Sequence, residues 1–208
     1  MRTWYSFPVL QSLDVLIPTF LILIVSLSVH EAAHAWTADR LGDPTARLLG
    51  RLTLNPWMHI DLIGTVVFPL LALYSGLPVI GWAKPVPVNG QNLRSPRRDF
   101  AVVALAGPVS NLMLAVGFAA IISLAAANTY GTLGDLVRIN VLLAVFNMIP
   151  IPPLDGGNVL AGFVPESFAR ALDGLRQWGF ILLYVLMFTG ILSDYVWPIG
   201  RAIVRVLL

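Results

Sequence analysis

The sequence predicts an all-α polytopic membrane protein with about 4–6 membrane helices, a re-entrant segment and short β elements at the cytoplasmic face. Two observations carry this prediction. Of 208 residues, 57% are apolar and only 12% are charged, with a mean hydropathy of +0.80. Soluble domains carry roughly a quarter charged residues, so too few are present here to cover a globular surface. The apolar residues also form several long runs, separated by short polar connectors. Residues 1–208 are expected to form a single integral-membrane domain.

The composition also restricts the chemistry. The chain has no cysteine, which excludes disulfides, thiol catalysis and thiolate metal sites, so any metal must be held by His, Asp or Glu. Net charge is +2, and the 13 Lys and Arg residues form no dense block. We therefore expect no nucleic-acid partner and interpret these residues as markers of membrane topology.

The first membrane span is predicted over 15–38, where Glu31 is the only charged residue when histidine is neutral. At about 1.5 Å per residue this helix crosses a hydrocarbon core of roughly 30 Å. A polar connector follows over 39–61. Within it, apolar residues alternate with others over 47–54, which predicts a short, half-buried strand.

The next apolar run, 62–80, is interrupted by Pro69, Gly76 and Pro78. Positive charges lie on both sides of it, and by the positive-inside rule both flanks are then cytoplasmic. We therefore expect the run to enter the membrane and return. The arginines concerned are Arg40, Arg47 and Arg51 before the run and Arg94, Arg97 and Arg98 after it.

Further spans are predicted over 101–127, 136–149 and 177–193, with a turn on the far side of the membrane over 128–135. Residues 196–208 are expected to form a short terminal helix whose arginines reach the membrane interface.

The chemistry centres on His30-Glu31-Ala32-Ala33-His34, near the end of the first span. Residues four apart share one face of a helix, so the two imidazoles converge and Glu31 lies beside them. Ionisable groups in hydrocarbon are costly and indicate a functional site. The alternative is a histidine pair that hydrogen bonds satisfy inside a polar helix interface. The motif is expected within the membrane, nearer the cytoplasmic side.

A catalytic zinc site needs a third protein ligand and an open position for water. Asp155 is the best candidate, because it follows the span over 136–149 and returns to the depth of His34. Prolines break the helix before it, and Gly156 and Gly157 allow close approach. Alternatively, Asp155 caps the next helix. His59 is the other candidate ligand, and we interpret it as a surface or structural histidine.

A zinc ion held by His30, His34 and Asp155, one per chain, would polarise a scissile carbonyl and acidify a bound water. Glu31 would take the proton of that water and pass it to the leaving amine. Asn147 could donate to the oxyanion or join two helices. Asn111 has the same two interpretations, and packing beside Gly107 is favoured.

Five segments together resemble the site-2 protease family of intramembrane zinc metalloproteases. They occur in the family's order over 30–157: HEAAHAW (30–36), GRLTLNPWMHID (50–61), GWAKPVPVN (81–89), LAGPVSN (105–111) and FNMIPIPPLDGG (146–157).

The resemblance implies zinc ligands His30, His34 and Asp155, catalytic Glu31, and Asn147 as a polar residue of the active site. It also implies a zinc-dependent endopeptidase that cleaves transmembrane helices of membrane proteins, a multi-pass location in a prokaryotic cell membrane, and the lipid bilayer as partner. Because the chain has no length for a PDZ or nucleotide-sensing domain, it resembles the compact branch of the family.

The extended segment 81–89 could pair with an unwound substrate through Val86 and Val88, or it could be a plain linker. Two other functions remain open. One is a non-catalytic membrane metal transporter or scaffold, and the other is an inactive relative that binds helices. Glu31 distinguishes the first, because a transporter or scaffold needs no base that is not a ligand. The intact HExxH motif and Asp155 argue against the second.

Overall fold

The computed structural model describes residues 13–75, 82–124 and 130–208, and this part of the chain is helical with no strand. The predicted all-α class is therefore confirmed. Residues 76–81 of the predicted re-entrant and extended segments lie outside the described residues. So do residues 125–129, at the end of the predicted span 101–127 and the start of the predicted turn 128–135. The principal helices are α1 (Leu13–Arg40), α2 (Thr45–Leu48), α3 (Phe68–Ser75), α4 (Pro96–Leu124), α5 (Tyr130–Asn147), α6 (Asp155–Phe163), α7 (Glu166–Leu175), α8 (Gly179–Phe188) and α9 (Ile191–Leu207).

Membrane character follows from length and apolarity. Among the described residues, three stretches are long and apolar enough to span a bilayer: Ile17–Arg40, Pro96–Leu124 and Glu166–Phe188. Large apolar side chains such as Leu21, Met113 and Ile181 are exposed on these helices. These exposed apolar side chains suit contact with lipid. The chain is a membrane protein.

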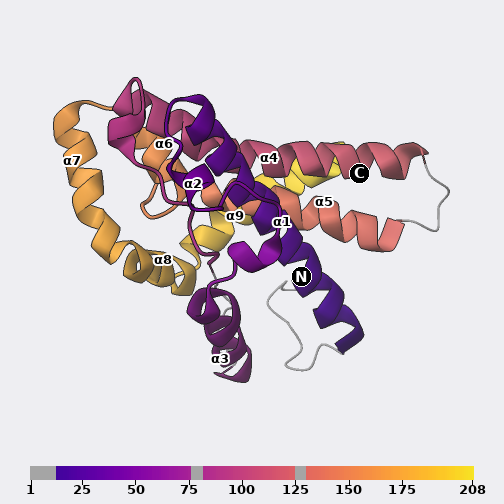
Figure 1. The fold of residues 1–208 in the computed structure, drawn as a ribbon. Coiled ribbons are helices and arrows are strands. Elements are labelled where there is room, and N and C mark those ends of the chain that lie inside the picture. The colour runs from indigo at the N-terminus through magenta and orange to yellow at the C-terminus, as the bar shows by residue number, and fades with distance from the viewer. Residues whose placement is uncertain (1–12, 76–81, 125–129) are drawn as a thin grey trace.

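Helix α4 is the central element and packs against α1, α5 and α6 (Figure 1). An apolar cluster lies between α4 and α5, where Ala115 and Ala119 meet Val137 and Val141, and α9 packs against it. Small residues on α4 let the helix axes approach closely, which is how membrane helices gain packing energy without a hydrophobic driving force.

The connector after α1 corrects one prediction. The strand expected over 47–54 is not formed, because α2 occupies its start and the chain then turns at Gly50, where φ is 67°. Gly50 donates to the Arg47 carbonyl and Arg51 to the Ala46 carbonyl, which is the Schellman pattern that ends a helix. The alternating leucines therefore reflect a helix end and a turn.

The apolar run after the connector begins with a π-helical turn, η2 (Leu62–Val67), and continues as α3. Asp61 caps it, accepting from the Gly64 backbone amide at 2.7 Å. The described part of this helical run, Leu62 to Ser75, rises about 20 Å.

The last two predicted helices are divided differently from expectation. The run predicted over 177–193 ends with α8 at Phe188, and α9 begins at Ile191. Gly190 between them has a φ of 81°, in the left-handed region that glycine occupies without steric cost, so the chain turns here.

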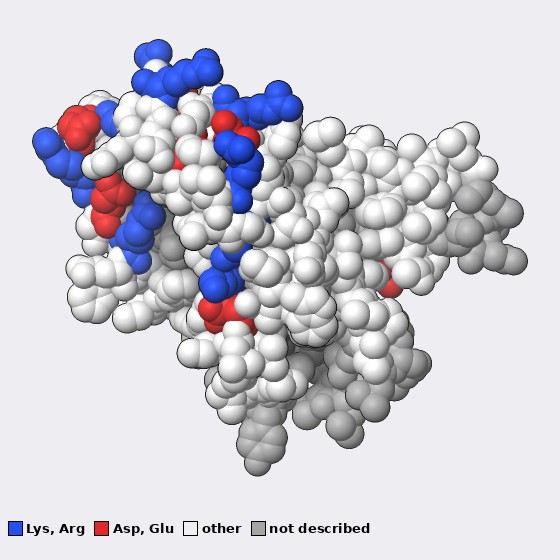
Figure 2. Space-filling model, in the orientation of Figure 1, with Lys and Arg blue, Asp and Glu red and all other residues white. Residues whose placement is uncertain are grey.

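Charged side chains gather at one end of the molecule, where α1 ends and α4 begins, whereas the far ends of α4 and α5 are mostly uncharged on this face (Figure 2). At the charged end, buried Asp43 links the turn between α1 and α2 to residues 89–92. It accepts hydrogen bonds from Thr45, Asn89 and Asn92. Burial alone would raise the pKa of Asp43, but these hydrogen bonds outweigh it and hold the pKa below its usual value.

Candidate metal centre

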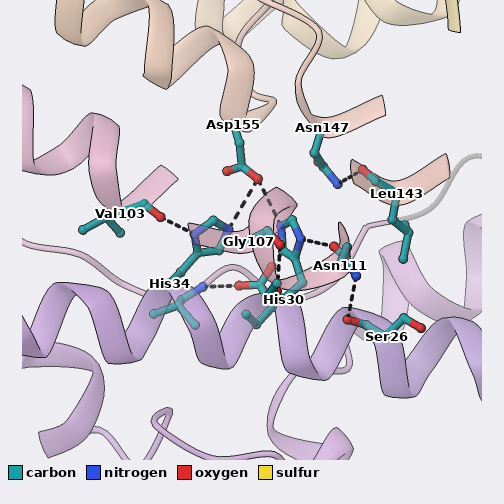
Figure 3. A network of polar contacts seen from close by, with 12 residues as sticks. Ser26, His30, His34, Val103, Gly107, Asn111, Leu143, Asn147 and Asp155 are labelled. Carbon is teal, nitrogen blue, oxygen red and sulfur yellow. Dashed lines mark hydrogen bonds and ion pairs between the residues drawn. The ribbon is translucent and has the colours of Figure 1, made fainter. Parts of the chain in front are cut away.

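Three predicted ligands meet in the space between α1, α4 and α6 (Figure 3). His30 and His34 project from one face of α1, as their spacing predicts. Asp155 is the first residue of α6 and points at both rings: its Oδ2 lies 3.0 Å from His30 Nε2 and 3.4 Å from His34 Nε2. Both histidines are buried, with 3% and 8% of their surfaces exposed.

The position of Asp155 depends on a tight turn between α5 and α6. Prolines at 150, 152 and 153 prevent α5 from continuing into this turn. Its backbone then packs directly on the start of α6, and neither Gly156 nor Gly157 has room for a Cβ against it. Gly179 is packed equally closely against Pro152. The glycines therefore let the turn bring Asp155 to the histidines.

The protonation pattern of the rings follows from their outer partners. His34 Nδ1 lies 2.7 Å from the Val103 carbonyl oxygen, which can only accept, so Nδ1 carries the proton. His30 Nδ1 lies 2.6 Å from Asn111 Oδ1, which also only accepts. In the neutral rings both Nε2 atoms are then unprotonated and present lone pairs toward Asp155.

This arrangement fits a metal ion. Asp155 Oδ2 is buried and, when both rings are neutral with the proton on Nδ1, it has no hydrogen-bond donor. Three electron-pair donors that converge without a proton between them are stabilised by a cation. Two imidazoles and one carboxylate form a ligand set that catalytic zinc uses.

Glu31 lies beside these ligands. One ligand atom each from Glu31, His30 and His34 falls within 4.8 Å of the others. Glu31 Oε2 accepts a hydrogen bond of 2.9 Å from the Val86 backbone amide, which orients the Glu31 carboxylate. Asp155, and not Glu31, is the carboxylate that contacts both imidazole rings. Glu31 can therefore act as a base close to the metal position.

Gly107 of α4 packs against the two histidines. A Cβ at this position would lie 2.5 Å from His30 Nε2 and from His34 Nε2. The absence of a side chain at Gly107 therefore leaves the space in which the ring nitrogens converge.

The other candidate residues have different places. Asn147 ends α5 and donates to the Leu143 carbonyl of its own helix at 3.0 Å, so its role stays a prediction. His59 is buried, with Nε2 2.8 Å from the Thr53 carbonyl, so it is a structural histidine and not a surface one. Asn111, which the sequence favoured as a packing residue, does link helices, because it bonds Asn140 of α5 and the Ser26 carbonyl of α1, and it also contacts His30.

Sequence reasoning missed Asn140 and Ser26. Asn140 of α5 is fully buried and bonds Asn111, the partner of His30. The available signal was a second amide inside the run 136–149, one helical stretch before Asn147, since polar groups in hydrocarbon require partners.

The sequence profile described as peptidase family M50 matches residues 123–189. YwhC of Bacillus subtilis is 39% identical over 86% of this chain and 84% of its own length. The chain belongs to peptidase family M50, the site-2 protease family. This membership confirms the predicted family and the prediction of a metalloprotease.

Two further relatives agree. Rip2 of Mycolicibacterium smegmatis is 32% identical over 83% of this chain and 67% of its own length. The protein sll0528 of Synechocystis is 43% identical over 76% of this chain but 34% of its own length. All three relatives bear the name "Putative zinc metalloprotease", in agreement with the predicted cofactor. No solved structure matches the chain significantly.

Proposed function

We propose that this M50 protein is a zinc-dependent intramembrane endopeptidase that hydrolyses peptide bonds in or near transmembrane helices. The observation that carries the proposal is the convergence of His30 Nε2, His34 Nε2 and Asp155 Oδ2 beside the Glu31 carboxylate. A transporter or scaffold could use the same ligands, but it has no need of Glu31.

Each residue of the site has its own proposed role in peptide hydrolysis. When bound, zinc supplies a Lewis acid that polarises a carbonyl and lowers the pKa of water to about 7. Asn111 and Val103 hold the two imidazoles in the tautomer that offers Nε2. Glu31, oriented by the Val86 amide, accepts a proton from the attacking water and returns it to the leaving amine.

Asn147 is proposed as the donor to the oxyanion. One hydrogen of its amide is engaged by Leu143, and the second is available to a substrate carbonyl.

The first test is the zinc content of the detergent-purified protein beside Asp155→Ala, measured by elemental analysis. We expect one zinc per wild-type chain and a sharp fall in the variant, because two imidazoles alone do not complete a catalytic zinc site. Asp173→Ala, on exposed α7, is the matched control and should keep its zinc. Zinc that survives loss of Asp155 would contradict the three-ligand assignment.

We further propose one domain over 1–208, crossing a prokaryotic cell membrane several times, with the active site nearer the cytoplasmic face. The common packing of α1, α5 and α6 on α4 supports a single domain. The clustering of charge where α1 ends and α4 begins supports the orientation (Figure 2). Positive charges on both flanks of the run 62–80 support a re-entrant segment.

The absence of native cysteine gives a direct test of this topology. Single cysteines at exposed Leu54 and Arg94 flank the re-entrant run, and Thr132 lies near the start of α5. A membrane-impermeant thiol reagent should label Leu54→Cys and Arg94→Cys from the cytoplasmic side and Thr132→Cys from the other. Labelling of Leu54→Cys and Arg94→Cys from opposite sides would mean that run 62–80 crosses.

The substrate is proposed to be an unwound stretch of a transmembrane helix that pairs with the segment 82–89. Hydrogen bonds in this segment fall on alternate residues, as in a strand: Trp82 and Lys84 donate to the Gly64 and His59 carbonyls, and Val86 donates to Glu31. Groups two residues apart in an extended chain point to the same edge. The Val86 carbonyl and the Val88 backbone then share the edge that faces Glu31, which supports pairing there.

Val88→Pro should test this pairing, because proline removes the Val88 donor and leaves the Val86–Glu31 contact. We expect cleavage of a fluorogenic peptide with an apolar helix to fall by up to about tenfold, from the loss of one hydrogen bond, with zinc content unchanged. Val88→Ala, which retains the backbone donor, serves as the control. Full cleavage by Val88→Pro would reject this role for the segment.

A further inference from the structure

A chain of buried amides leads from the metal centre into the core between α1, α4 and α5. Asn111 and Asn140 are both fully buried, and Ser26 is 1% exposed. Asn111 Nδ2 donates to Asn140 Oδ1 at 2.9 Å, and Asn111 Oδ1 faces His30 Nδ1 at 2.6 Å. Three helices therefore contribute to one continuous path of hydrogen bonds that ends on a metal ligand. Figure 3 shows the links from Ser26 to Asn111 and from Asn111 to His30.

The direction of this path is fixed at its far end. Asn140 Nδ2 donates to the Leu136 carbonyl of its own helix at 2.9 Å, and a backbone carbonyl can only accept. The same nitrogen lies 3.0 Å from Ser26 Oγ. Oδ1 of Asn140 must then face Asn111, so only the nitrogen of Asn111 can face Asn140. The oxygen of Asn111 is left for His30, whose Nδ1 must carry the proton.

We propose that Asn140 is a positioning residue that sets the tautomer of His30 through Asn111. If the Asn111 amide turned over, its nitrogen would face His30 Nδ1, and the proton of the neutral ring would move to Nε2. A protonated Nε2 cannot bind a metal. His30 can therefore bind zinc when the Asn111 oxygen faces Nδ1, and it cannot when the Asn111 nitrogen faces Nδ1. The proposal rests on the proposed zinc function and goes beyond it to a residue that touches neither metal nor substrate.

The Ser26 carbonyl offers Asn111 Nδ2 a second acceptor at 3.3 Å. Loss of Asn140 therefore weakens the preference for this orientation of the Asn111 amide without abolishing it. We therefore expect an effect at the lower end of the 10- to 100-fold range typical of groups that orient metal ligands.

The test measures the zinc dissociation constant of the full-length protein by chelator competition, with the thermal midpoint recorded beside it. Asn140→Leu removes the acceptor at similar volume and should weaken zinc binding about tenfold. Val141→Ala, a cavity in the same helix and core, is the matched control and should lower the thermal midpoint without changing zinc affinity.

Two further variants separate selection of the tautomer from simple packing. Asn140→Asp keeps an acceptor opposite Asn111, so its zinc affinity should stay within about twofold of wild type, even where stability falls. Adding Asn111→Asp to Asn140→Leu should restore zinc binding, because a carboxylate accepts from His30 Nδ1 in either orientation.

The outcomes are distinct. Absence of zinc from the wild type would overturn the proposed function itself. With zinc present, three results would overturn the proposed role of Asn140. These are an Asn140→Leu variant that binds zinc as tightly as wild type, a Val141→Ala variant whose zinc affinity falls as far as that of Asn140→Leu, or an Asn140→Asp variant that binds zinc as weakly as Asn140→Leu. Rescue by Asn111→Asp would support selection of the tautomer, since a purely structural role for Asn140 predicts no recovery.

Discussion

Glu31→Gln should reduce peptide hydrolysis by about 10²–10⁴-fold while leaving one zinc per chain, because glutamine cannot carry the proton between water and the leaving amine. The glutamine carbonyl can still accept the Val86 amide, so the geometry around the metal position is preserved. Cleavage is measured with a fluorogenic peptide that carries an apolar helix, and zinc is measured by elemental analysis of the same preparation.

Glu166→Gln is the matched control, since Glu166 is an exposed residue of α7 that pairs with Arg97. It should retain both zinc and turnover. Loss of zinc in Glu31→Gln would make Glu31 a ligand in place of a base. Unchanged function of the variant in its membrane would instead favour the transporter or scaffold, which needs the metal ligands but no base.

Gly107→Ala should weaken zinc binding by more than about a hundredfold, at or beyond the upper end of the range for groups that orient ligands. The added Cβ would lie 2.5 Å from the Nε2 atoms of His30 and His34. Both rings are held at Nδ1 by Asn111 and Val103, so they can move away only by breaking those hydrogen bonds. Chelator competition gives the dissociation constant.

The same helix offers a control in Gly117, where a Cβ would meet nothing within 4 Å. Gly117→Ala should stabilise α4 by up to about 1 kcal/mol through helix propensity and leave zinc affinity unchanged. If Gly107→Ala bound zinc as tightly as Gly117→Ala, the close contact between α4 and the two imidazoles would not determine the site.

The parts of the site that lie close together along the chain were predictable from the sequence. His30 and His34 fall on one face because helix periodicity is a local property, and Glu31 is then necessarily beside them. The end of the helix before Asp155 and the tight turn that follows it were equally predictable, because proline ends helices and glycine permits close backbone contact. Where local signals competed, prediction failed: over 47–54 the alternating leucines suggested a strand, whereas Gly50 ends a helix.

The sequence by itself therefore determined a membrane-embedded helical protein, two imidazoles on one helix face, a neighbouring carboxylate and the likeness to the site-2 protease family. The tertiary structure alone decided that Asp155 reaches those imidazoles, that Asn111 and Val103 accept hydrogen bonds from their Nδ1 atoms, and that Asn140 fixes the direction of the amide path. These contacts join helices far apart in sequence, with 81 residues separating His30 from Asn111. No local pattern encodes them, because the orientation of a side chain across a helix interface depends on how the helices pack.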